Sequence, residues 1–593
     1  MPYVAPVKDM LFVMNELAHI NQLTKISGLE DYGYETATAV LTESAKFCEN
    51  ELAPLNWTGD QKPSALKDGV VITSPGFKEA FKSYTEAGWQ GVIHPVEFGG
   101  QGLPKVISTA CLEMVNAANL SFALCPLLTD GAIEALLTAA SPELQARYVP
   151  KMISGEWTGT MNLTEPQAGS DLSMVRTRAT PQVDGSYKIF GTKIYITYGD
   201  HDMTQNIIHL VLARLPDAPE GIKGISLFVA PKSMVNADGS LGERNDIDCV
   251  SLEHKLGIKA SPTAVLQFGD HGGATAYLVG KENRGLEYMF VMMNAARFAV
   301  GIQGIAVADR SYQKAVRYAK DRVQGRDLDG SDGPVAIIHQ PDVKRMLMTM
   351  RAYIEGARAI AYVAALSSDL SHHHPDSESK ENYRAFYEFL VPIIKGFSTE
   401  MSIEVASLGL QVHGGMGFIE ETGAAQYYRD VRILTIYEGT TAIQANDLIG
   451  RKTVRDNGKV AKALARKIEE AENELAKSDS AVASSIRQNL ISARLAFENV
   501  VEYIVDNYKK DTKEVYAGSV TYLRLAGLLT CGWQMALAFL VAENKMKEDP
   551  DFYSAKIVTS QFYAEHLLTQ VAGLAQIIIE GGTSCIALEI KQF

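Results

Sequence analysis

The run YKIFGTKIYIT (residues 187–197) decides the fold, because apolar and polar residues alternate along it within a chain whose pattern is otherwise helical. Alternation with a period of two predicts a β-strand with one buried face. Apolar, β-branched runs at 207–215, 225–230 and 264–268 predict neighbouring strands. The segment from about 158 to 280 is therefore predicted to be a compact β domain.

Helical periodicity flanks this β domain on both sides. We predict a helical domain with an N-terminal extension at 1–157, the middle β domain at 158–281, a second helical domain at 282–455 and an additional helical block at 456–593. A chain of 593 residues is too long for one hydrophobic core, so several domains are expected. The fold class is mainly α with a central β domain.

Charge and cysteine usage exclude several classes of protein. The formal net charge of −14 disfavours binding to nucleic acid or to an anionic membrane, since both need a basic surface. The six cysteines form neither a C-x-x-C pair nor a metal-ligand spacing, so we expect reduced thiols and no metal site. The first residues show no secretory or transit signal, and a cytoplasmic location is expected.

Two segments invite an alternative interpretation. Residues 525–542 carry no charge and are long enough to span a membrane, but their Gly, Thr and Gln content favours a buried helix, so no stable membrane insertion is expected. The three histidines at 372–374 stand in a Ser-, Pro- and acid-rich stretch from 370 to 378. Metal ligands normally come from spaced positions, so a solvated loop between helices is predicted there.

A single carboxylate, Glu438, follows the apolar run ILTIY (433–437). Thr441 and Gln444 have the spacing of a capping box, which predicts a helix start just after it. Gly439 allows a close approach of another molecule to the carboxylate. A surface glutamate beside an ordinary turn is the alternative from this stretch alone.

Three further segments could contact a ligand. The loop TEPQAGSD (164–171) offers hydroxyls and exposed backbone to a flat heteroaromatic group and its phosphates, although a capped loop explains it equally well. RVQGR (322–326) follows a helix and carries guanidinium forks that suit phosphate oxygens. QVHGGMGF (411–418) is Gly-rich but follows a helical pattern instead of a strand, which makes a dinucleotide fingerprint of the Rossmann type a poor interpretation.

Taken together and in this order, these segments resemble the acyl-CoA dehydrogenase family over residues 40 to 450. The resemblance implies an N-terminal helical domain, a middle β domain and a C-terminal four-helix bundle, with FAD bound between them. The block after residue 450 is then an extra C-terminal helical domain.

The resemblance also implies roles for individual residues. Glu438 matches the catalytic base, and Thr164 and Ser170 match flavin and CoA contacts. Tyr195 and Thr197 match a Trp-x-Thr pair that lies against the flavin ring, with Tyr in place of the usual Trp. The remaining cofactor positions, several of them typically reached across a subunit interface, are Arg322, Gln324, Gln411, Gly414, Gly415 and Thr440. The remaining substrate positions are Arg297, Tyr437 and Gly439.

The chemistry that the resemblance implies explains the lone carboxylate. The α-proton of an acyl thioester is weakly acidic, so its removal needs a carboxylate in a dry site, where burial raises the pKa of Glu toward roughly 6–7. Glu438 takes the α-proton, the flavin accepts the β-hydride, and the Glu438 N–H with a ribityl hydroxyl stabilises the enolate-like oxygen.

The additions at 2–13 and beyond 450 resemble a longer bacterial branch of the family. This implies 3-(methylthio)propanoyl-CoA as substrate and 3-(methylthio)acryloyl-CoA as product, in the demethylation of dimethylsulfoniopropionate. A long-chain or broad-range fatty acyl-CoA substrate is the alternative. An acyl-CoA oxidase and a DNA-binding alkylation-response flavoprotein are further alternatives. Electron-transfer flavoprotein is the expected electron acceptor, and a homodimer is the expected assembly.

Overall fold

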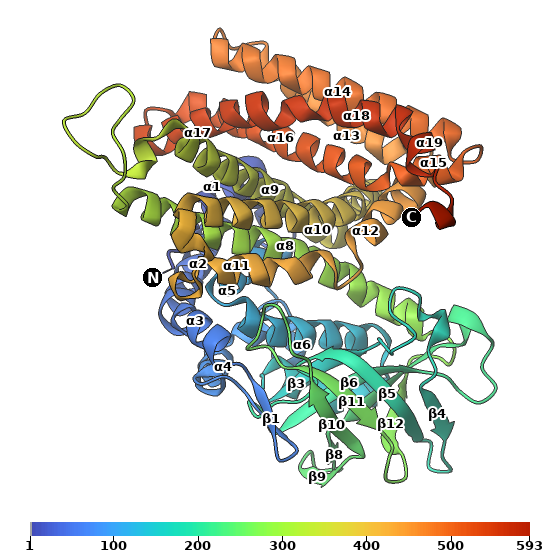
Figure 1. The fold of residues 1–593 in the computed structure, drawn as a ribbon. Coiled ribbons are helices and arrows are strands. Elements are labelled where there is room, and N and C mark those ends of the chain that lie inside the picture. The colour runs from blue at the N-terminus through green and yellow to red at the C-terminus, as the bar shows by residue number, and fades with distance from the viewer. Residues whose placement is uncertain (1–2) are drawn as a thin grey trace.

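The computed structural model describes residues 3–593, apart from the side chains of residues 291 and 292. A long helical bundle occupies the middle of the molecule, with the last helices of the chain on one side of it and the β domain with most of the N-terminal helices on the other (Figure 1). The predicted fold class, mainly α with a central β domain, is confirmed.

The N-terminal part is helical with one small hairpin. Its helices are α1 (Val7–Phe12), α2 (Tyr34–Phe47), α3 (Ala53–Gln61), α4 (Phe77–Glu86), α5 (Lys105–Ala118), α6 (Leu120–Ala139) and α7 (Pro142–Ile153), and the hairpin joins β1 (Ala65–Lys67) to β2 (Val70–Ile72). Helix α6 is apolar on nearly all sides because it is enclosed between α5, α8 and strand β3. The Asn119 side chain caps it by accepting from the Phe122 N–H.

The β domain contains one eight-stranded sheet, in which seven strands run in the order β10-β11-β5-β12-β7-β6-β3 and β4 pairs with β5. Its strands are β3 (Trp157–Asn162), β4 (Arg178–Pro181), β5 (Tyr187–Thr197), β6 (Asn206–Ala213), β7 (Ser226–Pro231), β10 (Ile247–Leu252), β11 (Thr263–Phe268) and β12 (Ala274–Val279), and β8 (Ser233–Val235) pairs with β9 (Leu241–Arg244) beside it. Strands β3, β6 and β7 are buried along their whole length, as their continuous apolar runs require.

The bundle consists of three long helices and two short ones, namely α8 (Gly285–Asp321), α9 (Pro341–His373), α10 (Ser377–His413), α11 (Ala424–Val431) and α12 (Thr441–Asp447). The predicted loop at 370–378 is wrong in its extent, because α9 continues through His372 and His373. Pro375 follows and cannot continue the helix. Asp376 then caps α10 through the Ser379 N–H, so the real connection is short.

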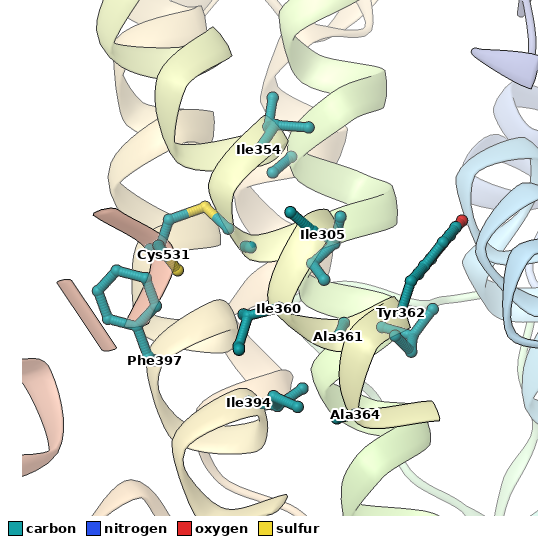
Figure 2. Packing of buried hydrophobic residues seen from close by; sticks show 14 of the residues in the cluster. Ile305, Ile354, Ile360, Ala361, Tyr362, Ala364, Ile394, Phe397 and Cys531 are labelled. Carbon is teal, nitrogen blue, oxygen red and sulfur yellow. The ribbon is translucent and has the colours of Figure 1, made fainter. Parts of the chain in front are cut away.

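The last part of the chain forms a helical layer against the bundle. Its helices are α13 (Lys459–Leu475), α14 (Ala481–Asn507), α15 (Thr512–Ala517), α16 (Ser519–Lys545), α17 (Pro550–Phe562), α18 (Val571–Glu580) and α19 (Gly582–Cys585). Figure 2 shows Cys531 of α16 beside Phe397 of α10, with Ile305, Ile354 and Ile394 in the same core. Gly527 permits this approach, since a Cβ there would stand 2.2 Å from the Phe397 ring.

Three described helices, α6, α8 and α16, are long and apolar enough to cross a membrane by length and composition. In α16 the apolar window is 83% buried inside the protein. The apolar side chains of 525–542 are therefore used for packing between α9, α10 and the C-terminal helices, as the sequence predicted.

Candidate active site

Glu438 stands in a short bend between the 3-10 turn Arg432–Thr435 and helix α12. Its backbone is left-handed, with φ at +52°, which is strained for a residue with a side chain. Gly439 follows at φ +85°, where a Cβ would meet the Gln444 side chain at 2.8 Å. The bend therefore needs glycine after the glutamate.

The predicted capping box at Thr441 and Gln444 is wrong by one residue. Thr440 is the N-cap, and its hydroxyl accepts from the Ile443 N–H at 3.4 Å. The Gln444 amide instead donates to the carbonyls of Glu438 (3.2 Å) and Gly439 (3.3 Å). The tight bend at Glu438 brings these carbonyls over the first turn of α12, so Gln444 supports the bend itself.

Glu438 lines a cleft between the N-terminal helices, the β domain and the helical bundle. Tyr437, Glu438 and Thr197 lie in its lining together, and the β domain also contributes Met161. Helix α8 contributes Ala295, Ala296 and Phe298. Apolar side chains of α5 and α6 form the remaining wall, among them Leu112, Val115, Leu124 and Leu127. The empty space of the cleft, including its mouth, is about 1330 Å³.

Two cations act on the charge of the Glu438 carboxylate. Burial raises the pKa of Glu438 above its usual value, and the positive charges of Lys395 and Arg297 oppose this effect. Arg297 is buried on α8 and pairs with Asp447 at 3.3 Å. It does not line the cleft, so its predicted contact with substrate stays a prediction, while its electrostatic influence on Glu438 is direct.

Tyr437 is also held in place. Its hydroxyl donates to the Gln303 side chain of α8 at 2.5 Å, and its ring faces the cleft. Sequence reasoning missed Gln303, because a polar residue within the long α8 pattern carries no local sign of this contact.

Strand β5 contains a bulge at the position of the predicted flavin contacts. Lys193 pairs with Leu266 and Ile196 with Ala264, so two residues of β5 oppose the single residue between them on β11. Tyr195 adopts φ +60° there and is 60% exposed despite its aromatic ring. The bulge therefore presents an open aromatic face two residues before Thr197.

The loop that holds Thr164 and Ser170 is fixed by a buried ion pair. Lys193 of β5 contacts Glu165 at 2.8 Å and donates to the Leu163 carbonyl at 3.1 Å. Glu165 also accepts from the N–H groups of Arg176 and Thr177. Burial disfavours its charge, but Lys193 and these donors lower the pKa of Glu165 to about 2. The loop is thus tied to β5 beside Tyr195, whereas the Ser170 side chain stays exposed.

We expect Thr177→Val to loosen this loop. The change removes a hydroxyl that donates to Glu165 at 2.6 Å and keeps the shape of the side chain. A hydrogen bond to a charged group contributes about 1.5–3 kcal/mol, so stability should fall by about that amount. Faster amide hydrogen exchange at residues 164–171 would confirm the effect, and Thr180→Val on the exposed face of β4 is the matched control. Equal exchange in both variants would contradict it.

The other predicted cofactor residues lie apart from this cleft. Arg322, Gln324, Gln411, Gly414 and Gly415 are all exposed and contribute nothing to the cleft lining. They share one surface, because Tyr318 near the end of α8 stacks on His413 at the end of α10 with 4.4 Å between ring centroids. Whether this surface binds a cofactor held by a second copy of the chain stays a prediction.

Several features fit a flat cofactor that carries phosphates. Tyr195 and Thr197 share one side of β5 and offer an aromatic face and a hydroxyl. A Cβ at Gly169, Gly414 or Gly415 would meet no described atom within 4 Å, so backbone there is open to close approach. Residues of this kind at these places are compatible with FAD.

Models of the acyl-CoA dehydrogenase family match four successive parts of the chain. The N-terminal domain matches residues 35–156, the middle domain 160–271, the C-terminal domain 283–452, and the acetyl-CoA dehydrogenase C-terminal-like domain 459–589. The chain belongs to the acyl-CoA dehydrogenase family and is an oxidoreductase, as the sequence predicted.

Individual members of the family are similar to the chain over most or all of its length. The chain is 50% identical to 3-methylmercaptopropionyl-CoA dehydrogenase of Ruegeria pomeroyi over 593 residues, which is the whole of both chains. It is 34% identical to a butyryl-CoA dehydrogenase of Syntrophomonas wolfei over 608 aligned residues, covering 100% of this chain and 99% of the relative. The solved acyl-CoA dehydrogenase from Bacillus anthracis, complexed with FAD, shares the fold with a TM-score of 0.74 at 22% identity, over 94% of this chain and 90% of that one.

Proposed function

We propose that the protein oxidises 3-(methylthio)propanoyl-CoA, also called 3-methylmercaptopropionyl-CoA, to 3-(methylthio)acryloyl-CoA. The observation that carries the reaction type is the half-buried Glu438 carboxylate, set in a left-handed bend at a largely apolar cleft. The full-length 50% identity to the Ruegeria pomeroyi enzyme supports the thioether substrate.

The chain's own groups account for the proton transfer. Glu438 accepts the α-proton, and the electron pair of the broken C–H bond forms the Cα=Cβ double bond as hydride leaves the β-carbon. The apolar wall from α5 and α6 excludes water, which keeps the carboxylate basic enough for this step. Within residues 3–593 the Glu438 N–H donates to no protein acceptor, so it is free to stabilise the negative charge that develops on the thioester oxygen.

FAD is the cofactor of the family, and when bound it supplies the acceptor for the β-hydride. The residues proposed to hold it are Tyr195, Thr197, Thr164 and Thr440, with Ser170 near the CoA. The exposed surface formed by Arg322, Gln324, Gln411, Gly414 and Gly415 would complete the site of a second copy. On this surface the side chain of Phe418 is 90% exposed, and a homodimer would bury it.

We also propose an electron acceptor and a cellular location. Electron-transfer flavoprotein would reoxidise the cofactor, and the six unpaired cysteines suit a cytoplasmic protein. A DNA-binding role is disfavoured because basic side chains of the last helices already pair with carboxylates, as Arg494 does with Glu472 and Glu498. If the protein were an acyl-CoA oxidase instead, it would release peroxide in air when mixed with substrate alone.

We expect selective reduction of the flavin by the thioether substrate. The FAD-loaded protein is mixed anaerobically with 3-(methylthio)propanoyl-CoA, butyryl-CoA or palmitoyl-CoA, and bleaching of the visible flavin band is followed. A pocket gains or loses about 10–200-fold for each misplaced methylene, so the thioether substrate should lead by at least about tenfold in kcat/KM. Preference for palmitoyl-CoA would identify a fatty acyl-CoA dehydrogenase instead, and no bleaching by any of the three would refute the proposal.

A further inference from the structure

Lys395 lies on α10 directly behind the catalytic bend and has no exposed side-chain surface. Its ammonium donates to the Leu434 carbonyl at 2.9 Å and to the Gly439 carbonyl at 2.7 Å. These carbonyls stand on either side of Glu438 in sequence. One buried cation therefore fastens both ends of the bend that holds the carboxylate.

The partners of Lys395 are unusual for a buried lysine. Lys193 and Lys556, which are equally enclosed, contact carboxylates at 2.8 Å and 2.7 Å, namely Glu165 and Glu355. Among the residues that the structure describes, the acceptors of Lys395 are backbone carbonyls alone. Burying an ammonium costs several kcal/mol unless opposite charge and hydrogen bonds compensate. Without such compensation, an apolar side chain at position 395 would make the protein more stable than lysine does. Among the carboxylates whose charge favours the ammonium of Lys395, Glu438 has the largest effect.

We propose that Lys395 is a positioning residue for the Glu438 base, which clamps the two carbonyls around it and holds a positive charge behind its carboxylate. The inference rests on the role of Glu438 proposed above.

The electrostatics of the pair agree with this geometry. Burial lowers the pKa of Lys395 to about 8, against the opposing effect of the Glu438 charge. Lys395 is therefore charged at neutral pH, and its charge in turn lowers the pKa of Glu438. Arg297 of α8 acts in the same direction and is itself neutralised by Asp447, beside Arg451. The other titratable groups around the bend and across the cleft are Glu400, Asp430, Tyr437, Tyr84, Cys111, Lys105, His94, Asp130 and Glu134.

Removing the charge of Lys395 should raise the pKa of the Glu438 carboxyl. Glu438 acts as a base only when ionised, so the rate of flavin reduction should rise with pH as its carboxyl loses a proton. An opposite charge at close range lowers a carboxyl pKa by about 1–3 units, and Arg297 remains when Lys395 is removed. Lys395→Met should therefore move the acidic limb of the pH profile up by about one unit and reduce the rate about tenfold below it.

The test compares three variants of the FAD-loaded enzyme. Anaerobic flavin reduction by saturating substrate is measured from pH 5.5 to 9 for Lys395→Met, for Lys395→Arg, which keeps the charge, and for Lys556→Met. The last removes a buried ammonium that pairs with Asp9 and Glu355 and is not among the charges that shift the pKa of Glu438. A second readout that needs no turnover is the infrared titration of the Glu438 carboxyl, with Glu438→Gln as the blank. FAD content and thermal unfolding are recorded for every protein.

The proposal expects the acidic limb and the infrared titration to shift together in Lys395→Met, with an unchanged KM and with the shift largely reversed in Lys395→Arg. Lys556→Met should lose stability and keep the wild-type limb. An unshifted limb in Lys395→Met, a shift of the same size in Lys556→Met, or a Lys395→Met protein that does not fold or hold FAD would overturn it, because Lys395 would then only stabilise the core. Failure of the wild-type enzyme to reduce its flavin would instead refute the proposed function.

Discussion

Glu438→Gln should abolish flavin reduction while the protein still binds FAD and acyl-CoA. Glutamine has the shape of glutamate, so the left-handed bend and the support from Gln444 and Lys395 remain. The amide, however, cannot accept the α-proton. Loss of a general base costs about 10²–10⁴ in rate, and a weakly acidic α-proton puts the expected loss at the upper end of that range. Stopped-flow bleaching of the flavin by 3-(methylthio)propanoyl-CoA measures it.

The matched control is a glutamate of the bundle that takes no part in the cleft lining. Glu404 lies on α10, is about 40% exposed and pairs with Arg524 at 3.5 Å. Glu404→Gln should leave the rate within about twofold, because Glu404 does not line the cleft and its exposed ion pair contributes only about 0–1 kcal/mol to stability. Exchange of the α-proton with solvent deuterium should stop in Glu438→Gln and continue in Glu404→Gln. A Glu438→Gln enzyme with more than a tenth of the wild-type rate would exclude Glu438 as the base.

The sequence predicts most of the fold because periodicity reports burial. The alternation at 187–197 and the apolar runs after it correspond to β5, β6, β7 and β11 within a few residues. What periodicity cannot report is a single inserted residue. The bulge that exposes Tyr195 does not interrupt the alternation of apolar and polar residues in the sequence. The bulge arises from the way β11 pairs with β5, which the sequence of β5 alone does not show. The same limit explains the shifted cap at Thr440, where the bend decides which hydroxyl faces the helix.

Some residues of the site can be recognised in the sequence, whereas others reach the site only through packing. Glu438 is conspicuous because one charge ends an apolar run, and the resemblance of several motifs to a known family gives it a role. Lys395 has no such mark, since it lies about forty residues earlier among apolar neighbours on α10 and meets the bend only in the folded protein. Arg297 is the converse case: the resemblance gives it a contact with substrate, and packing turns it toward Asp447. Contacts between distant segments are set by tertiary packing, which local patterns do not encode.

Arg358→Met should produce the largest loss of stability. Arg358 of α9 is 2% exposed and donates to Glu113 of α5 at 2.6 Å and 2.9 Å, and to Asp9 of α1 at 2.6 Å. Lys556 of α17 contacts Asp9 as well, so one network joins the N-terminal extension, the bundle and the C-terminal helices. Removing one partner of a buried ion pair costs about 3–5 kcal/mol, because the other charge stays buried without compensation. Arg345→Met, which breaks the exposed pair with Asp342, should cost at most about 1 kcal/mol.

The pH dependence of stability distinguishes the loss of buried ion pairs from a simple loss of packing. Burial opposes the charge of Asp9, but Lys556 and Arg358 lower its pKa to about 2. Its folded pKa thus lies below the unfolded value of about 3.9, so its contribution is complete above about pH 5 and is lost as the pH falls through 2. Arg358→Met should reduce this contribution, and Arg358→Met/Glu113→Gln should recover part of the stability lost at pH 7, because the uncompensated carboxylate is gone. If the double variant is less stable than the single one by the full cost of a second independent substitution, the loss arises from packing and not from charge.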